Sequence, residues 1–107
     1  AQDWARFGTL YLRDGTWDGV RLLPEGWVDH GRRVRSRDDT DDSLYGAHWW
    51  IDQLDTERGS FRASGYDGQM VGICPPLDAI VVRLGATPQN LLPNLPPWRK
   101  RMFDTLA

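Results

Sequence analysis

Residues 69–84 read QMVGICPPLDAIVVRL, and this stretch decides the fold class. Its two ends, residues 69–74 and 79–84, are apolar and rich in β-branched side chains, which is typical of strands. The short connection of residues 75–78 favours antiparallel neighbours, because parallel strands need a longer crossover. The second strand is almost wholly apolar, so we expect it to lie centrally in the sheet.

Two further segments upstream have the composition of strands. Residues 45–51, YGAHWWI, are aromatic and β-prone, and residues 61–64 follow after a polar segment that contains Gly59. Neighbouring residues of a strand point to opposite faces, so one of Trp49 and Trp50 is expected in the core. The sequence therefore predicts an antiparallel sheet of about three to four strands.

A first helix is expected before this sheet. Asp3 can cap it, Gly15 can end it in a left-handed conformation, and it would extend to about Arg13. Its apolar side chains fall on one face, namely Trp4, Phe7 and Tyr11. Residues 16–20 then predict a turn around Asp-Gly.

A second helix is expected from Pro24, the residue type favoured at the first helical position, with Trp27, Val28 and Val34 on its buried side. Residues 35–43, RSRDDTDDS, are polar and lack periodicity, which predicts a solvated, mobile loop. A third helix should close the chain over residues 98–106. Its apolar stripe recurs every four residues, at Trp98, Met102 and Leu106. Helices and antiparallel strands in this order predict an α+β protein.

Composition excludes several classes of function. The 107 residues amount to one small domain, and a formal net charge of −2 with no basic stripe disfavours phosphate-driven binding of nucleic acid. The longest apolar run is interrupted by Arg83 and is too short for a membrane span. The single Cys74 excludes an internal disulfide and a cysteine-based zinc site, and leaves both the cytosol and an exported location open.

No catalytic set of residues is complete within the chain. No serine has a lysine three residues further on, and Lys100 is the only lysine, so a Ser-Lys hydrolase cannot be assembled from these residues alone. His30 and His48 have no paired ligand or adjacent serine in the sequence, so we expect neither a metal site nor a catalytic base there. Residues 64–69, with two glycines between two strands, indicate a tight turn or a close backbone approach.

Several blocks in order resemble the C-terminal part of the serine β-lactamase family, which includes class C β-lactamases, penicillin-binding DD-peptidases and related esterases and amide hydrolases. The blocks are DWARFGTLYLRDGTWDG at 3–19, RLLPEGWV at 21–28, YGAHWW at 45–50, ASGYDGQ at 63–69 and LDAIVVRLGAT at 77–87. The resemblance implies one incomplete domain, residues 1–107, that is the C-terminal portion of a β-lactamase-type fold. It implies ester, amide or β-lactam hydrolysis through an acyl-serine, a small-molecule substrate and no cofactor.

The resemblance also implies site residues. Tyr66, Asp67 and Gly68 stand where the family has Lys-Thr-Gly or His-x-Gly, and would contact substrate. Gln69, the next residue, would donate its backbone N–H to the oxyanion. Tyr66 replaces a lysine and carries no charge at neutral pH, which favours an esterase or amidase over a β-lactamase. Without the Ser-x-x-Lys nucleophile, the chain alone is expected to be inactive.

Two other interpretations stay open. The six tryptophans could form a non-catalytic binding surface for glycan or peptidoglycan, which requires exposed indoles. An open sheet edge could instead lead to self-association.

Overall fold

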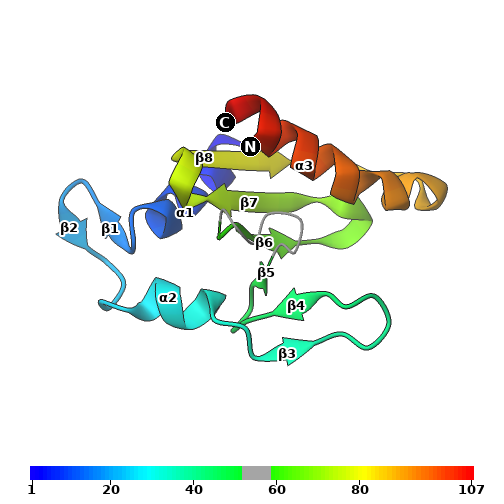
Figure 1. Ribbon diagram of the computed structural model, residues 1–107. Coiled ribbons are helices and arrows are strands. Elements are labelled where there is room, and N and C mark those ends of the chain that lie inside the picture. The colour runs from blue at the N-terminus through cyan, green and yellow to red at the C-terminus, as the bar shows by residue number, and fades with distance from the viewer. Residues whose placement is uncertain (52–58) are drawn as a thin grey trace.

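The three strands predicted around residues 61–84 are confirmed. The computed structural model describes residues 1–51 and 59–107, and in it β6 (Phe61–Ser64), β7 (Met70–Cys74) and β8 (Ala79–Arg83) pair antiparallel in that order (Figure 1). Phe61 lies opposite Ile73, and Met70 lies opposite Arg83. This register brings the end of β8 beside the turn between β6 and β7.

The sheet is wider than the three to four strands expected. Three strands of two residues each extend it, in the order β3-β4-β5-β6-β7-β8: β3 (Ser36–Arg37), β4 (Leu44–Tyr45) and β5 (Trp50–Ile51). The prediction of an unstructured loop over residues 35–43 was therefore wrong at its start, where β3 pairs with β4. The single strand predicted over residues 45–51 was also wrong, because the chain turns back within it and Tyr45 of β4 lies opposite Trp50 of β5. Strands of two residues are too short to show alternation, so the sequence revealed neither β3 nor this division.

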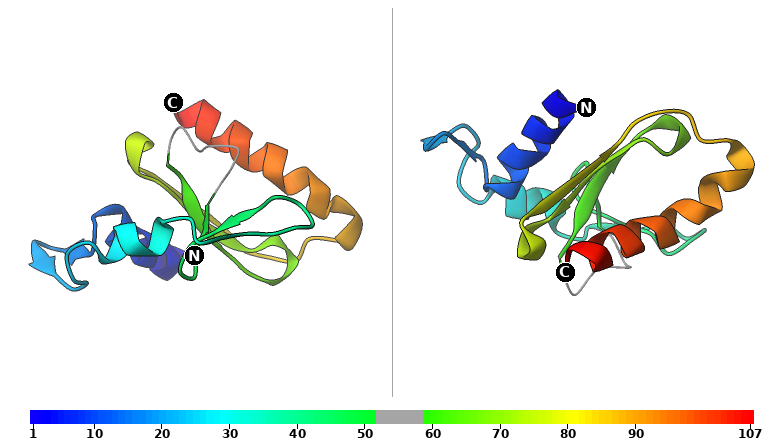
Figure 2. Two further views of the ribbon diagram at one scale, coloured as in Figure 1. Left: turned by 60° about the horizontal axis from the view of Figure 1, so that its bottom comes forward. Right: turned by 90° about the horizontal axis from the view of Figure 1, so that it is seen from above.

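The prediction that residues 79–84 lie centrally was also wrong. Within the described residues β8 is an edge strand, whereas β7 is the strand that is buried at all five positions. β8 is nonetheless apolar on both faces because helices cover both: α1 (Gln2–Leu12) packs on one side and α3 (Leu95–Leu106) on the other (Figure 2). An apolar strand therefore indicates cover on its two faces and not a central position.

The first helix ends as predicted but begins differently. Its N-terminal cap is Ala1 and not Asp3, whose carboxylate instead pairs with Arg6 at 2.6 Å. Gly15, at φ 85°, donates its N–H to the carbonyl of Leu10 at 2.8 Å, which closes the helix. The predicted Asp-Gly turn joins β1 (Thr16–Trp17) to β2 (Val20–Arg21) as a two-stranded hairpin.

The second helix is shorter than expected. α2 (Trp27–Arg32) begins three residues after Pro24, because Gly26 adopts a left-handed conformation at φ 81° immediately before it. Val28 is buried as predicted, but Trp27 and Val34 are each 49% exposed. The prediction that all three share a buried side was wrong, because α2 ends at Arg32, before Val34, and a helix of six residues can bury little of its surface.

The closing helix is rotated relative to its predicted apolar stripe. α3 follows the short helical turn η4 (Gln89–Asn94), and it buries Arg99 and Phe103, whereas Met102 and Leu106 are 36% and 52% exposed. The ring of Phe103 sets this rotation. It packs over Gly72 of β7, where an added Cβ would lie 3.6 Å from the ring edge.

Helices on both faces of the sheet produce a layered α+β arrangement (Figure 2). The core lies mainly on the side of α1 and α2 and consists of Val28, Trp49, Phe61, Val71 and Ile73. Gly8 allows α1 to approach closely, since a Cβ there would lie 3.0 Å from Ile80. Trp49 is the buried member of its pair, and Trp50 is half-buried with its ring 4.7 Å from that of Tyr45.

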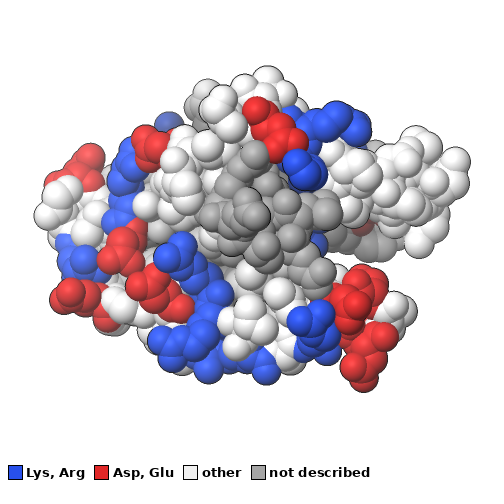
Figure 3. All heavy atoms as spheres, in the orientation of Figure 1, with Lys and Arg blue, Asp and Glu red and all other residues white. Residues whose placement is uncertain are grey.

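The surface is mixed in charge. Basic and acidic side chains alternate over the face in Figure 3, and acidic side chains gather at the loop between β3 and β4. No helix in the described part of the chain is long and apolar enough to cross a membrane.

Candidate functional site

The turn between β6 and β7 contains all the site residues predicted from the sequence. Gly65 continues the strand in an extended conformation, and a 3₁₀ turn, η2 (Tyr66–Gly68), follows. The turn is closed by the N–H of Gly65, which donates to the carbonyl of Gln69 at 2.7 Å. Asp67 and Gly68 both adopt left-handed conformations, at φ 58° and 81°. Glycine tolerates this conformation without strain, whereas Asp67 adopts it at a cost.

The four predicted residues differ in exposure. Tyr66 is 85% exposed and its ring reaches into solvent, while Asp67, Gly68 and Gln69 are half-buried. The backbone N–H of Gln69 donates to the carbonyl of Tyr66 at 3.3 Å, which is long for such a bond. Among the described residues, no acceptor takes the N–H of Tyr66. The turn therefore offers one weakly bonded N–H and one N–H that has no acceptor in the described part of the chain.

Residues from β8 and beyond hold this turn in place. The side-chain amide of Gln69 donates to the carbonyl of Tyr66 at 3.2 Å and accepts the N–H of Gly85 at 3.3 Å. Arg83 donates from Nη1 to the carbonyl of Gly68 at 3.1 Å. Sequence reasoning missed these contacts, although one signal existed: Arg83 is the charge that interrupts the apolar run of β8.

A hollow of about 290 Å³ adjoins the turn on the side of α1. Its lining is mainly apolar and consists of Trp4, Ala63, Ser64, Gly65, Gln69, Met70, Val71 and Leu84. Trp4 and Leu84 are 51% and 47% exposed, so the hollow is open to solvent. Backbone N–H groups beside an apolar hollow can stabilise a developing oxyanion once water is excluded from the site.

The structure brings no nucleophile and base together in the described residues. Ser64 borders the hollow, but its hydroxyl accepts a hydrogen bond from Nε of Arg62 at 3.1 Å. Lys100 lies in α3 and pairs with Asp104 at 2.7 Å. Ser64 and Lys100 therefore do not form a Ser-x-x-Lys arrangement, which the sequence does not contain.

A second pocket brings together the two histidines that the sequence leaves apart. It encloses about 260 Å³ and is lined by Tyr11, Trp27, His30, Gly31, Ala47, His48 and Trp49. Trp27 stacks on His30 with ring centroids 5.7 Å apart, and Arg35 donates to Nδ1 of His30 at 2.9 Å. The described residues contain no cluster of three potential metal ligands.

The fold and the turn define the class of protein. No family model matches the chain. It aligns over 99% of its length, with a TM-score of 0.80 and 28% identity, with part of a solved structure from Bacillus anthracis. The chain is therefore homologous to a portion of a β-lactamase-family serine hydrolase, as the sequence blocks indicate.

The particular relatives share one name. The Bacillus anthracis protein is provisionally called a 6-aminohexanoate-dimer hydrolase. The 6-aminohexanoate-dimer hydrolase of Paenarthrobacter ureafaciens is 31% identical over 97 residues, which is 82% of this chain. The chain spans only 24% of the Paenarthrobacter relative and 28% of the Bacillus structure.

Proposed function

We propose that residues 1–107 form a single incomplete domain, the C-terminal portion of a β-lactamase-type serine hydrolase. The observation that supports this most strongly is the alignment of nearly the whole chain, at a TM-score of 0.80, with about a quarter of a named hydrolase. In this proposal the nucleophilic serine and its lysine come from outside these residues. The chain contributes the sheet and one donor of the oxyanion hole.

The proposed role of the turn follows from acyl transfer. The serine oxygen attacks the substrate carbonyl, and negative charge develops on the carbonyl oxygen until the amine or alcohol leaves. The N–H of Gln69 donates to that oxygen, exchanging its long bond to the Tyr66 carbonyl for a stronger one. Water then releases the acyl group. Tyr66, Asp67 and Gly68 contact the substrate from the same turn.

The substrate class that we propose is a small amide or ester. Both relatives are named for an amide, the 6-aminohexanoate dimer. The mainly apolar lining of the hollow suits an aliphatic chain beside the scissile bond. Tyr66 offers a phenol and no positive charge, so a β-lactam carboxylate is the less favoured ligand.

A chimera tests the proposal. Residues 1–107 replace the matching portion of the Paenarthrobacter enzyme, and hydrolysis of the 6-aminohexanoate dimer and of a nitrophenyl ester is measured. We expect turnover that disappears when the serine of the relative's Ser-x-x-Lys is changed to alanine. A soluble, folded chimera without turnover of either substrate would contradict the proposal.

Within the chimera, two substitutions isolate the backbone donor. Gln69 has φ −69° and ψ 143°, a conformation that proline adopts, so Gln69→Pro removes the N–H at a favourable φ, and its ring displaces the Tyr66 carbonyl that the N–H contacts. Gln69→Ala loses the same side chain and keeps the N–H. We expect kcat to be about 10²- to 10³-fold lower in Gln69→Pro than in Gln69→Ala. Equal rates would show that Gln69 is not the donor.

The isolated chain provides a second test. A fluorophosphonate probe should form no adduct with the 107-residue chain, because the chain lacks the nucleophile. A stoichiometric adduct, mapped by mass spectrometry to Ser64 or to another serine, would mean that the chain carries its own nucleophile, contrary to the proposal.

One observation favours a different function, a glycan-binding surface. Trp27 is 49% exposed and borders the pocket that also holds Tyr11 and both histidines. An exposed indole can stack on a sugar ring. If this function is correct, peptidoglycan fragments quench indole fluorescence in the wild type and not in Trp27→Ala.

A further inference from the structure

The peptide bond between Gly68 and Gln69 is anchored at its carbonyl end. Arg83, half-buried at the end of β8, donates from Nη1 to the Gly68 carbonyl at 3.1 Å. The guanidinium of Arg83 also lies over the ring of Trp98 in α3, 6.0 Å from its centroid. The carbonyl is therefore directed toward the side of the sheet that α3 covers.

The planarity of the peptide transmits this anchoring to the next N–H. In a trans peptide the C=O and N–H groups share one plane and point in opposite directions. A Gly68 carbonyl that points toward Arg83 thus turns the Gln69 N–H the opposite way, where it meets the Tyr66 carbonyl at 3.3 Å, and Gln69 itself lines the hollow beside Trp4. Rotation of this peptide would disrupt both orientations together.

The atoms around Gly68 leave the turn little room to move. A Cβ at this residue would contact Cδ1 of Leu95 and would lie 3.3 Å from Oγ1 of Thr87. The same atom would lie 3.5 Å from Nη1 of Arg83. The turn therefore sits directly on residues from the end of β8 and the start of α3, with the guanidinium as its charged contact.

The charge of Arg83 adds to its geometric effect. The guanidinium is a cationic donor, so its hydrogen bond to the Gly68 carbonyl is charge-assisted. Hydrogen bonds in a chain polarise one another, and a carbonyl that accepts a cationic donor leaves its N–H a stronger donor.

We propose that Arg83 is a positioning residue of the oxyanion-binding turn: its guanidinium orients and polarises the Gly68–Gln69 peptide, whose N–H binds the oxyanion. This inference rests on the proposed function, because it assumes that Gln69 is a donor. It makes Arg83 act through a backbone group and not by contact with substrate.

The contact itself is tested in the 107-residue chain by NMR. Arg83→Met removes the charge and keeps a side chain of similar length for packing on Trp98. We expect the ¹³C′ shift of Gly68 and the ¹⁵N shift of Gln69 to move, and the Gln69 amide to exchange faster with solvent. Arg83→Lys, which retains the charge, should recover part of the change.

Arg21 supplies the matched control. Its Nη1 also donates to backbone carbonyls, of Asp14 at 2.9 Å and Leu23 at 3.1 Å, but in the region of the β1–β2 hairpin. Arg21→Met should leave the Gly68 and Gln69 signals unchanged. Unchanged signals in Arg83→Met, or equal changes in Arg21→Met, would overturn the anchoring role.

The catalytic consequence is tested in the chimera by combining substitutions. With alanine at residue 69, Arg83→Met should lower kcat by about ten-fold, less than the loss of a whole donor, and leave KM unchanged. With proline at residue 69 there is no N–H to position, so Arg83→Met should have no further effect. An equal loss in both backgrounds would show a merely structural role and overturn the inference.

The donor role of Gln69 and the positioning role of Arg83 can be disproved separately. If Gln69→Pro and Gln69→Ala are equally active while Arg83→Met still moves the Gly68 and Gln69 signals, Gln69 is not the donor and the positioning role is overturned with it. If the proline variant is inactive and the signals do not move, the donor is confirmed and Arg83 is not what holds it.

Discussion

Gly68 shows how one residue can be required for two separate physical reasons. Its φ of 81° is a conformation that residues with a Cβ rarely adopt, and a Cβ added there would meet Leu95, Thr87 and Arg83. Gly26 has the same φ of 81°, but a Cβ added there would meet no atom within 4 Å. The two glycines therefore separate backbone strain from steric overlap.

We predict that Gly68→Ala destabilises the chain more than Gly26→Ala does. The left-handed conformation alone costs about 1 kcal/mol in each, and overlap with Leu95 adds about 1–3 kcal/mol at residue 68. Urea unfolding of both variants measures the difference. Equal losses of stability would contradict the packing described around Gly68.

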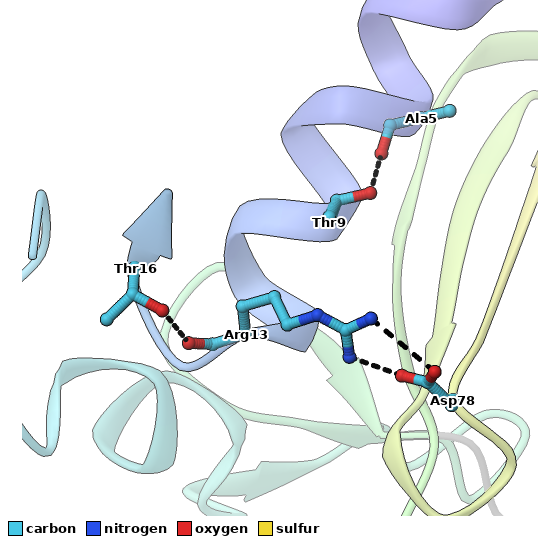
Figure 4. A network of polar contacts seen from close by, with 5 residues as sticks. All are labelled: Ala5, Thr9, Arg13, Thr16 and Asp78. Carbon is cyan, nitrogen blue, oxygen red and sulfur yellow. Dashed lines mark hydrogen bonds and ion pairs between the residues drawn. The ribbon is translucent and has the colours of Figure 1, made fainter. Parts of the chain in front are cut away.

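Asp78 makes the stability of the fold depend on pH because it pairs with Arg13. The side chains of Arg13 and Asp78 tie the end of α1 to the turn between β7 and β8, with Nη2 3.4 Å from Oδ2 (Figure 4). The hydrogen bond and the charge of Arg13 lower the pKa of the Asp78 carboxyl below its ordinary value of 3.8. A lowered pKa in the folded state means that the folded chain binds this proton less readily than the unfolded chain.

The stabilisation by Asp78 is therefore complete above about pH 4 and is lost as pH falls through the lowered pKa. Both side chains are exposed, so the effect is small. We expect Asp78→Asn, which tolerates the left-handed φ of 50° at this residue, to reduce the acid dependence of the urea midpoint. Asp3→Asn, which removes an ion pair within one helix, serves as the control. A wild type and an Asp78→Asn variant with parallel acid profiles would refute this.

At the scale of the element, the sequence predicted what local patterning determines. Strands β6, β7 and β8 each have at least four residues, and their apolar runs and turn residues were visible. The two-residue strands β3 to β5 exist only through their partners. Local patterning therefore gave no sign of β3, and it merged β4 and β5 into the one strand expected over residues 45–51.

The candidate site divides in the same way. The glycines of the turn were conspicuous in the sequence, and they placed Tyr66 to Gln69 together. Arg83 and Gly68 are fifteen residues apart in the chain. Their contact depends on the strand register that sets Met70 opposite Arg83. Sequence spacing alone contains no information on that register, since the turn and the strand ends must first be fixed.

Phe103 fixes α3 to the sheet, and its removal should release the whole element. It is 1% exposed and packs over Gly72. Phe103→Ala should cost about 3–5 kcal/mol in urea unfolding, because the small residues beneath it leave a cavity. Met102→Ala, at a residue that is 36% exposed, should cost much less. Because Leu95 of α3 covers Gly68, the amide of Gln69 should also exchange faster in Phe103→Ala. Similar costs in the two variants would mean that α3 does not depend on this contact.

At the scale of the whole molecule, the distribution of exposed apolar side chains is uneven. Trp4 and Phe7 of α1 are 51% and 39% exposed, with ring centroids 5.9 Å apart, and Leu84 beside the hollow is 47% exposed. The chain aligns with about a quarter of the length of each relative. In such a relative the rest of the polypeptide is available to cover this face. In the chain alone the same face meets water, which favours association with a second copy.

We therefore predict that the 107-residue chain associates reversibly and that Trp4→Ser weakens the association at least ten-fold. Burying the exposed half of an indole removes on the order of 100 Å² from water, worth about 2–3 kcal/mol. Sedimentation velocity over a concentration series measures the effect. Leu106→Ser is the control, because Leu106 is 52% exposed but belongs to α3, on the opposite side of the sheet. If both substitutions act equally, or if the wild type stays monomeric, the face around Trp4 is not a contact surface. Association that persists unchanged in Trp4→Ser would instead favour an edge of the sheet, which among the described residues is formed by β3 or β8, with backbone N–H and C=O groups available to a second strand.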